Sequence, residues 1–546
     1  MRLLLICFLG TIVLSCSKEL DKIPLHAPST ESFPRTLGDF QTALVGCHSP
    51  LQLVVSSISF TSMFEMYSDI GVHRDNTPDV MMGDPGSSFV RTIWTTMYRG
   101  IGRCNYLLDN VGNANSDVDM TALKNIEASA KYLRAYYYSL LTELFGDVPY
   151  ITTTLPLAEA NVSRTPKAQV VDSILADLEA ASQYLKEENN PASMSISKGA
   201  AWALMSRVAL YNERWNAAIS AAGKVMAQEG SQFILEPDYQ VLTKLAGNSS
   251  KELIWAIHWS YTDATNSGPT YFRSRNSGGF TNRMPTQALV DSYQDKDGLP
   301  IDKSPLYNPL KPYENRDPRL HWTIAVPGSI FCGYQYETHK DSVRCWNYNV
   351  TPAIRIPNED AINPFASFSG FSWRKYVDST EFDEGAKTAI SSIVMRYAEV
   401  LLNYAEAKIE SNQIDQSVYE AINKVRRRAK MPEIETGKTQ SELRSILRYE
   451  RKVEFAGEGT RYFDLLRWRI ADKLLNGPCY GRIPNGILAG APVIDSNWTP
   501  HYEGISNYTQ MRVIQVRRFN NPRNYLWPIP DIEIQVNKNL VQNQGY

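Results

Sequence analysis

Long apolar segments are rare in this 546-residue sequence, and their scarcity limits how the chain can contact a membrane. A helix that crosses a bilayer needs roughly 20 mainly apolar residues. The stretch Leu3–Leu14 is too short for that, but with Arg2 before it and Ser15 after it, it has the three parts of a secretory signal. We therefore expect residues 1–15 to be removed during export, and no other segment to hold the chain in a membrane.

Cysteine and histidine are also scarce, with seven of each. Two cysteines lie in the N-terminal region, and the other five are widely spaced without a CxxC pair, which excludes the usual zinc and redox motifs. The histidines are dispersed, so we expect no metal site. Cys332 and Cys345 are close enough in sequence for a hairpin-sized disulfide in an oxidising compartment, and two free buried thiols are the equal alternative.

Strong charge of one sign and the common catalytic motifs are missing too. The formal net charge is −2 with scattered lysines and arginines, so no basic face for nucleic acid is expected. GxSxG, HExxH and GxGxxG do not occur, and "PEIETGKT" has Pro432 where a phosphate-binding loop needs its first glycine. "DKDG" at 295–298 lacks calcium-loop spacing and predicts a turn. A carboxylate pair for glycoside hydrolysis stays open, because it needs no sequence motif.

A lone cysteine follows the apolar stretch, which an ordinary secretory signal does not require. The stretch resembles a bacterial lipoprotein signal that is cleaved before Cys16, whose thiol then carries lipid, although Val13 and Leu14 depart from the usual lipobox. A plain cleaved signal is the alternative. We predict that residues 16–38 form a lipidated, solvated tether and N-terminal segment.

Helical periodicity dominates residues 39–230 and 386–546. Apolar residues recur at three- and four-residue steps from Leu123 to Leu144, and Gly146 ends that run. Residues 197–228 predict two helices joined near Glu213, and residues 395–432 predict a second such pair. The alanines where the backbones must approach resemble tetratricopeptide (TPR) units, although no strict 34-residue period is readable. We predict a mainly α fold.

The middle of the chain, residues 231–385, has a different composition. Gly, Pro and Asn punctuate short apolar strands such as "ELIWAIHW", and 20 of the 122 residues from Trp255 to Tyr376 are aromatic, against 11% of the whole chain. A long irregular insert in a helical scaffold is a usual place for function. Exposed rings beside Asn, Asp and Arg suit carbohydrate, because sugar faces stack on flat rings while hydroxyls bond to polar groups. Burial of most of these rings in the core is the alternative.

Four further motifs identify a family. They are "NRDPRLHWTI" (315–324), "RYAEVLLNYAEAKIE" (396–410), "ILRYERKVEFAGEGTRYFDLLRWR" (446–469) and "LWPIPDIEIQVNKNLVQNQGY" (526–546). Together with "WTTMYRGIGRCNYLLDN" (94–110) and the lipoprotein-like signal, they make the chain resemble the SusD/RagB family of Bacteroidetes outer-membrane lipoproteins along essentially its whole length.

These motifs also have a structural interpretation. Arg451, Arg461, Asp464 and Arg467 have the pattern of ion pairs that fasten helix ends to the loop layer. The terminal "PIPDIEI" predicts an extended segment laid back over the body, because its prolines block a helix. We expect Trp94 and Asn105 to lie in the core.

The resemblance implies a scaffold of four TPR-like pairs with a shallow binding surface and no catalysis or cofactor. Family members act with a SusC-like TonB-dependent transporter, cover its extracellular mouth, and deliver oligosaccharide, or in some branches peptide, into the barrel. A lipid tether on the cell surface would keep such a lid at high effective concentration over its partner. A surface glycosidase and a purely structural TPR adaptor are the alternatives from other classes.

The ligand site is the part that resemblance transfers least, because the loops vary with substrate. Starch-binding members use aromatic and polar residues from loops after the early helices and from the central insert. The comparable positions here give candidates for hydroxyl recognition (Asp69, His73, Arg74, Asp75 and Asn76), for stacking (Tyr271, Phe272, Trp346, Tyr348 and Trp373) and for polar or acidic groups (Arg273 and Arg275).

Overall fold

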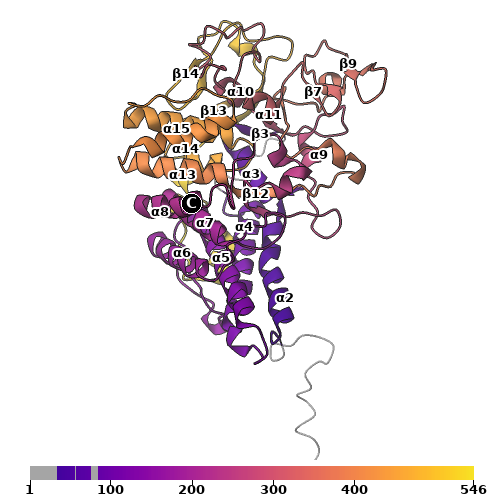
Figure 1. Ribbon diagram of the computed structural model, residues 1–546. Coiled ribbons are helices and arrows are strands. Elements are labelled where there is room, and N and C mark those ends of the chain that lie inside the picture. The colour runs from indigo at the N-terminus through magenta and orange to yellow at the C-terminus, as the bar shows by residue number, and fades with distance from the viewer. Residues whose placement is uncertain (1–32, 56, 75–83) are drawn as a thin grey trace, which may run out of the picture.

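The computed structural model describes residues 33–55, 57–74 and 84–546 (Figure 1). Antiparallel helices make most of the body, and in chain order α4, α5, α6, α7 and α8 each pack against the next, after which α13 packs on α8 and is followed by α14 and α15. Their bounds are α2 Leu37–His48, α4 Ser88–Asp109, α5 Met120–Phe145, α6 Lys167–Ser182, α7 Lys198–Tyr211, α8 Trp215–Met226, α13 Tyr397–Glu410, α14 Gln416–Arg428 and α15 Gln440–Glu454. The mainly α, TPR-like fold of helical pairs is therefore confirmed.

Local sequence explains the long helix α5 and its close approach to α4. The Asp119 side chain accepts the N–H of Thr121 at the first turn, and Gly146, at φ +75°, ends the helix. Gly100 of α4 lies against the ring of Tyr137, where an added Cβ would stand 2.4 Å from a ring carbon. The Tyr137 hydroxyl donates to the carbonyl of Cys47 in α2, 2.6 Å away. This packing leaves Trp94 and Asn105 buried, as predicted.

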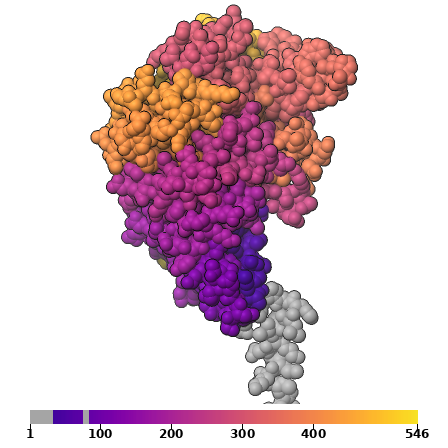
Figure 2. Space-filling model, viewed as in Figure 1, coloured from indigo at the N-terminus to yellow at the C-terminus, as the bar shows by residue number. Residues whose placement is uncertain are grey.

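The chain between α8 and α13 forms short strands and short helices. The longest strands of this stretch are β4 (Leu253–Ile257) and β12 (Ser392–Arg396), which pair antiparallel in the core and are buried throughout. A four-stranded sheet of order β10-β9-β8-β7 lies in the lobe that projects at the upper right (Figures 1 and 2). Its strands are β7 Ile330–Phe331, β8 Tyr334–Gln335, β9 Arg344–Asn347 and β10 Ile354–Pro357.

The remaining elements are short and connect the layers. The strands are β1 Val54–Val55, β2 Ile58–Ser59, β3 Gly71–His73, β5 Arg283–Pro285, β6 Ile324–Ala325, β11 Ser372–Trp373, β13 Gly477–Tyr480, β14 Val493–Ile494, β15 Pro500–His501 and β16 Val513–Arg517. The short helices are α3 Phe60–Met63, α9 Gly268–Phe272, α10 Gln287–Ser292, α11 Arg319–Thr323, α12 Glu359–Ile362, α16 Arg461–Arg467, α17 Ala471–Leu474 and α18 Asp531–Val536.

The structure corrects one expectation about the C-terminus and resolves one about cysteine. Residues 531–536 form helix α18 because Pro530 lies before its first turn, where the missing N–H costs nothing, so the segment is not extended throughout. Trp527, just upstream, is buried against the rings of Phe89 and Phe145. Cys332 and Cys345 are free thiols, so the disulfide does not form.

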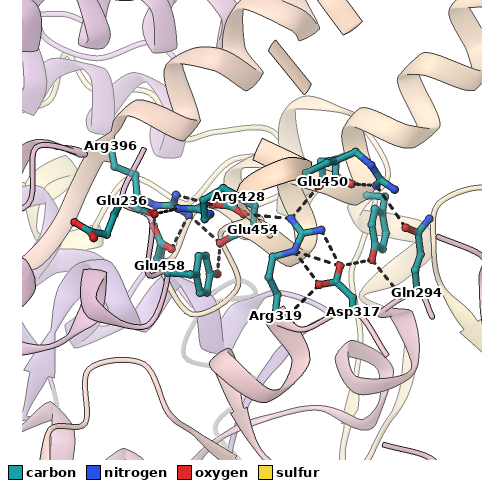
Figure 3. Close-up of polar contacts among 12 residues, drawn as sticks. Glu236, Gln294, Asp317, Arg319, Arg396, Arg428, Glu450, Glu454 and Glu458 are labelled. Carbon is teal, nitrogen blue, oxygen red and sulfur yellow. Dashed lines mark hydrogen bonds and ion pairs between the residues drawn. The ribbon is translucent and has the colours of Figure 1, made fainter. Parts of the chain in front are cut away.

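A network of fully buried ion pairs joins the insert to the C-terminal helices (Figure 3). Arg396, at the end of β12, contacts Glu252 at 2.6 Å, Glu454 at 2.7 Å and Glu458 at 2.8 Å. Arg319 of α11 contacts Asp317 at 2.7 Å, Glu450 at 2.9 Å and Glu454 at 3.2 Å. Arg428 joins Glu252 and Glu454, and Arg426 joins Glu450. We call this set the buried charge network.

A second group of ion pairs has the arrangement expected from the C-terminal motif. Arg451 contacts Asp464 at 2.9 Å, and Arg467 contacts both Glu406 at 2.6 Å and Asp464 at 2.7 Å. These pairs fasten α16 to α13 and α15, so the ion pairs predicted from the motif form, but they join helices to one another. Of the predicted residues, Arg461 pairs with Asp69 in the chain that leads to β3. Their carboxylates accept two or more charge-assisted hydrogen bonds, which offsets the cost of removing them from water.

We expect Arg396→Gln to lower the free energy of unfolding by about 3–5 kcal/mol, because it leaves buried carboxylates without a shared cation. Arg427→Gln is the matched control, since its pairs with Glu420 and Glu433 are exposed and should contribute less than about 1 kcal/mol. Urea denaturation followed by circular dichroism measures both. Equal, small losses would show that the network does not stabilise the fold.

Glu65 predicts a pH dependence of stability. Its Oε2 accepts the N–H of Gly459 at 2.7 Å, whereas its Oε1 has no hydrogen-bond partner among the described residues, and burial raises its pKa from 4.5 to about 7. The folded protein therefore keeps a proton that the unfolded chain releases as the pH rises from about 4.5 to about 7, so this group favours folding at low pH and loses that contribution across the window.

Glu65→Gln does not titrate, so its free energy of unfolding relative to the wild type should rise by about 1–3 kcal/mol between pH 5 and pH 8. Thermal denaturation of both proteins at the two pH values measures this change. Any effect of the substitution on stability that does not depend on pH is the same at both values and cancels in the comparison. Glu127→Gln, in a surface pair with Lys131, serves as control and should show no such change. A difference that is flat with pH for Glu65→Gln would contradict the assignment.

Candidate ligand-binding surface

Strand β3 brings one end of the N-terminal region to the insert. It pairs antiparallel with β5, so that His73 lies opposite Arg283, and the N–H of Arg74 donates to the carbonyl of Asn282 at 2.8 Å. Gly71 begins β3 because any Cβ there would stand 2.5 Å from the carbonyl oxygen of Glu65. This pairing fixes the position from which the Arg74 side chain extends.

Arg74 and Arg275 converge on one backbone carbonyl. Nη1 of Arg74 donates to the carbonyl of Phe365 at 2.8 Å, and Nε and Nη2 of Arg275 donate to the same oxygen at 3.1 and 3.0 Å. The guanidinium of Arg74 lies 5.4 Å from the ring centre of Phe365, and that of Arg275 lies 5.7 Å from the ring centre of Phe280. Both rings are exposed, Phe280 by 41% and Phe365 by 59%.

Tyr271, in α9, completes this group. Its ring meets Phe280 edge-on at 5.3 Å, and the guanidinium of Arg283 covers it at 4.6 Å. We call Arg74, Tyr271, Arg275, Phe280 and Phe365 the aromatic–arginine surface. Flat rings beside guanidinium donors can stack on sugar rings and bond to hydroxyl or acidic groups.

Trp346 and Tyr348 lie apart from these five residues, on and after β9. They are 37% and 44% exposed, and Arg355 of β10 covers the Trp346 ring at 5.4 Å. Cys345 is buried and its Sγ accepts from Nδ2 of Asn276 at 2.6 Å. Because neighbouring side chains of a strand point to opposite faces, Trp346 faces away from the side of β9 that meets the Arg275 loop.

Three predicted contact residues are buried, and we correct these predictions. Phe272 and Trp373 are 5% and 2% exposed, so neither ring presents a face to a ligand, and Arg273 lies under the ring of Phe382 at 4.5 Å. Trp373 is held in β11 against Gly457.

Asp69 is engaged within the protein. Its carboxylate contacts Arg461 at 2.8 Å and Lys452 at 3.4 Å, and these cations hold its pKa well below the usual range against the opposing effect of burial. It therefore belongs to the ion pairs of the C-terminal motif and not to a sugar site. Asp75, Asn76 and Cys16 lie outside the described residues.

Sequence reasoning missed the two exposed rings, Phe280 and Phe365. The available signal was their neighbours, since Phe280 follows "SGG" and Phe365 follows Pro364, and a large apolar residue beside a turn often stays at the surface. The high aromatic content of the insert indicated the segment in which these rings lie. It could not distinguish exposed rings from buried ones.

A groove of about 900 Å³ lies elsewhere on the insert, along residues 310–329 with Glu337 and Arg482. Tyr313, His321 and Trp322 line it, and Nε2 of His321 contacts the carbonyl of Tyr313 at 2.8 Å. None of the predicted site residues that the structure describes lines this groove. Within the described ranges, no cluster of three or more His, Cys, Asp or Glu is placed to hold a metal ion, and no helix is both long and apolar enough to cross a membrane.

Comparison with known proteins identifies the family to which this chain belongs. A model of the SusD family matches residues 251–546, and one described as "Starch-binding associating with outer membrane" matches residues 55–210. The chain belongs to the SusD family. SusD-like protein P2 of Formosa agariphila is 26% identical over all of this chain and 99% of its own length.

Solved structures of SusD-like proteins share the fold. A SusD-like carbohydrate-binding protein from Bacteroides fragilis superposes with a TM-score of 0.79 at 29% identity, over 93% of this chain and 99% of the other. A laminarin-binding SusD-like protein superposes with a TM-score of 0.64 at 20% identity, over 94% and 100%, a likeness that shows the fold alone.

We expect Asp69→Asn to destabilise this SusD-family protein by about 3 kcal/mol or more, because it leaves Arg461 and Lys452 buried beside an uncharged amide. Asp341→Asn, at a carboxylate whose side chain is 76% exposed, should have little effect. Thermal denaturation compares the two. If Asp69→Asn is as stable as the wild type but no longer binds ligand, Asp69 is a ligand contact and our correction is wrong.

Proposed function

We propose that the protein is a non-catalytic, cell-surface lipoprotein that captures oligosaccharides and passes them to a SusC-like TonB-dependent transporter. Cys16 would carry the lipid that holds it at the outer membrane. Family membership supports this role, as do the carbohydrate-binding and laminarin-binding names of two structural neighbours. The observation that carries the proposal is the aromatic–arginine surface, where exposed rings lie beside guanidinium groups.

The energetics suit capture for transport. Ring stacking contributes about 0.5–1.5 kcal/mol beyond the burial of apolar area, so a few rings on an open surface give an affinity that holds an oligosaccharide and still releases it. Trp346 and Tyr348 offer a second pair of exposed rings on β9, at which a longer glycan could make a further contact.

The first test is binding of the chain from residue 22 onward, which keeps every described residue, to neutral and acidic polysaccharides and to mixed peptides, with product analysis of the same samples. We expect saturable binding to one glycan class without cleavage. Cleavage would overturn the non-catalytic role, and binding to peptides alone would replace oligosaccharide by peptide as the cargo.

Phe365→Ala should weaken glycan binding about threefold to tenfold, because it removes one stacking ring. Leu157→Ala is the matched control, since Leu157 is an apolar side chain 92% exposed on a different segment, and it should leave affinity unchanged. Isothermal titration calorimetry measures both. Equal affinities of Phe365→Ala and the wild type would remove this ring from the site.

A further inference from the structure

Positive charge gathers around residues 359–368, at the aromatic–arginine surface. Arg74 and Arg275 share the carbonyl of Phe365, as described above. The guanidinium of Arg74 also lies 5.9 Å from the ring centre of Phe368, and that of Arg512 lies only 3.5 Å from the same centre. Arg512 directly precedes β16, and it contacts the same ring as Arg74. Lys340 lies nearby and donates to the carbonyl of Ala361 at 2.7 Å. We call Arg74, Arg275, Lys340 and Arg512 the cation cluster.

Arg512 differs from Arg275 and Lys340 in the polar contacts of its side chain. It is half-buried on the Phe368 ring, and its guanidinium makes no hydrogen bond or ion pair with any residue in the described part of the chain. Burial alone lowers its pKa, with no neighbouring carboxylate opposing that effect. A partly desolvated guanidinium normally acquires an anionic or hydrogen-bonding partner, because leaving it unmatched is costly.

Arg275 and Lys340 are held by backbone carbonyls, which are dipoles and cancel no charge. Burial, and then repulsion from Arg74, lowers the pKa of Arg275, and burial, and then repulsion from Arg512, lowers the pKa of Lys340. Both shifts reflect cations close enough to repel one another.

In the described part of the chain, two carboxyl groups act on Arg275, and they do not balance the charges of Arg275, Lys340 and Arg512. Glu359 and Asp360 both attract Arg275. Asp360 is buried, its Oδ1 accepts the backbone N–H of Arg275 at 2.7 Å, and burial raises its pKa to about 7, so near neutral pH much of it is uncharged. Among the described residues around Arg275, Lys340 and Arg512, positive charge therefore exceeds negative charge, although the formal charge of the whole chain is −2.

We propose that the cation cluster binds a carboxylate or sulfate group of an acidic oligosaccharide, while Phe280 and Phe365 contact its sugar rings. This inference rests on the proposed function and names its substrate class. Guanidinium presents a planar fork of donors that matches the paired oxygens of either anion, and a partly buried site screens the attraction less than open water does. A neutral glycan would leave the repulsion between Lys340 and Arg512 uncompensated.

The test compares acidic with neutral polymers on the same protein, using polygalacturonate and chondroitin sulfate against amylose and laminarin. Each acidic polymer is compared with its own carboxyl-reduced or desulfated derivative. The derivative that loses binding shows which anionic group the protein recognises. We expect an acidic polymer to bind at least about tenfold more tightly than its neutralised derivative, and added NaCl to weaken that binding.

Variants assign the effect to the cluster. Arg512→Gln and Arg275→Gln should each weaken acidic binding about tenfold, and Arg512→Lys should recover only part of it, because lysine keeps the charge and loses the planar fork. Arg344→Gln, at an exposed arginine of β9, controls for general attraction between a polyanion and basic residues and should have little effect. Circular dichroism checks that each variant is folded.

The outcomes separate this inference from the proposed function. Tight binding of amylose or laminarin, unaffected by either glutamine variant, would overturn the acidic class and leave glycan capture standing. Acidic binding that falls equally in Arg344→Gln would overturn the cluster as its site. Absence of binding to all four polymers and their derivatives would overturn both proposals.

Discussion

Burial of charge is the constraint on which this structure depends. Arg319 and Arg396 have fully buried guanidinium groups, and each is tolerable only because several carboxylates reach it at once. These carboxylates come from segments far apart in the chain, at the start of β4 and at the end of α15. The network therefore requires the insert and the C-terminal helices to be in register, and no member can move without exposing another to an apolar surrounding.

The motifs that identify the family supply most of the residues of the buried charge network. "NRDPRLHWTI" supplies Asp317 and Arg319, and "ILRYERKVEF" supplies Glu450 and Glu454. They report how the scaffold is held together and carry no information about the ligand. The candidate surface instead consists of loop residues such as Phe280 and Phe365, which the scaffold positions and which can change without disturbing the buried ions.

The sequence was informative where periodicity or charge pairing governs structure, and much less so where burial depends on distant partners. The steps of three and four residues located α5, α7, α8, α13 and α14, and the spacing around Arg451 and Asp464 indicated their ion pairs. The local sequence does not separate Phe272 and Trp373 from Phe280 and Phe365, yet the first two are in the core. They line one small cavity with Met66 and Gly457, which come from segments far away in the chain. Asp69 was misplaced for the same reason, since its partner Arg461 lies 392 residues downstream.

Trp527 has a consequence for how the chain must be made. Its ring fills the space between Phe89 and Phe145, and its indole N–H donates to the Tyr462 hydroxyl at 2.9 Å, so residues near the end of the chain complete the core of its first helices. During synthesis the N-terminal half emerges long before this ring is available, and it cannot bury those aromatic faces alone. Folding of the N-terminal core is thus completed only when the whole polypeptide is available. A fragment released early would expose its aromatic side chains to quality-control proteases and chaperones.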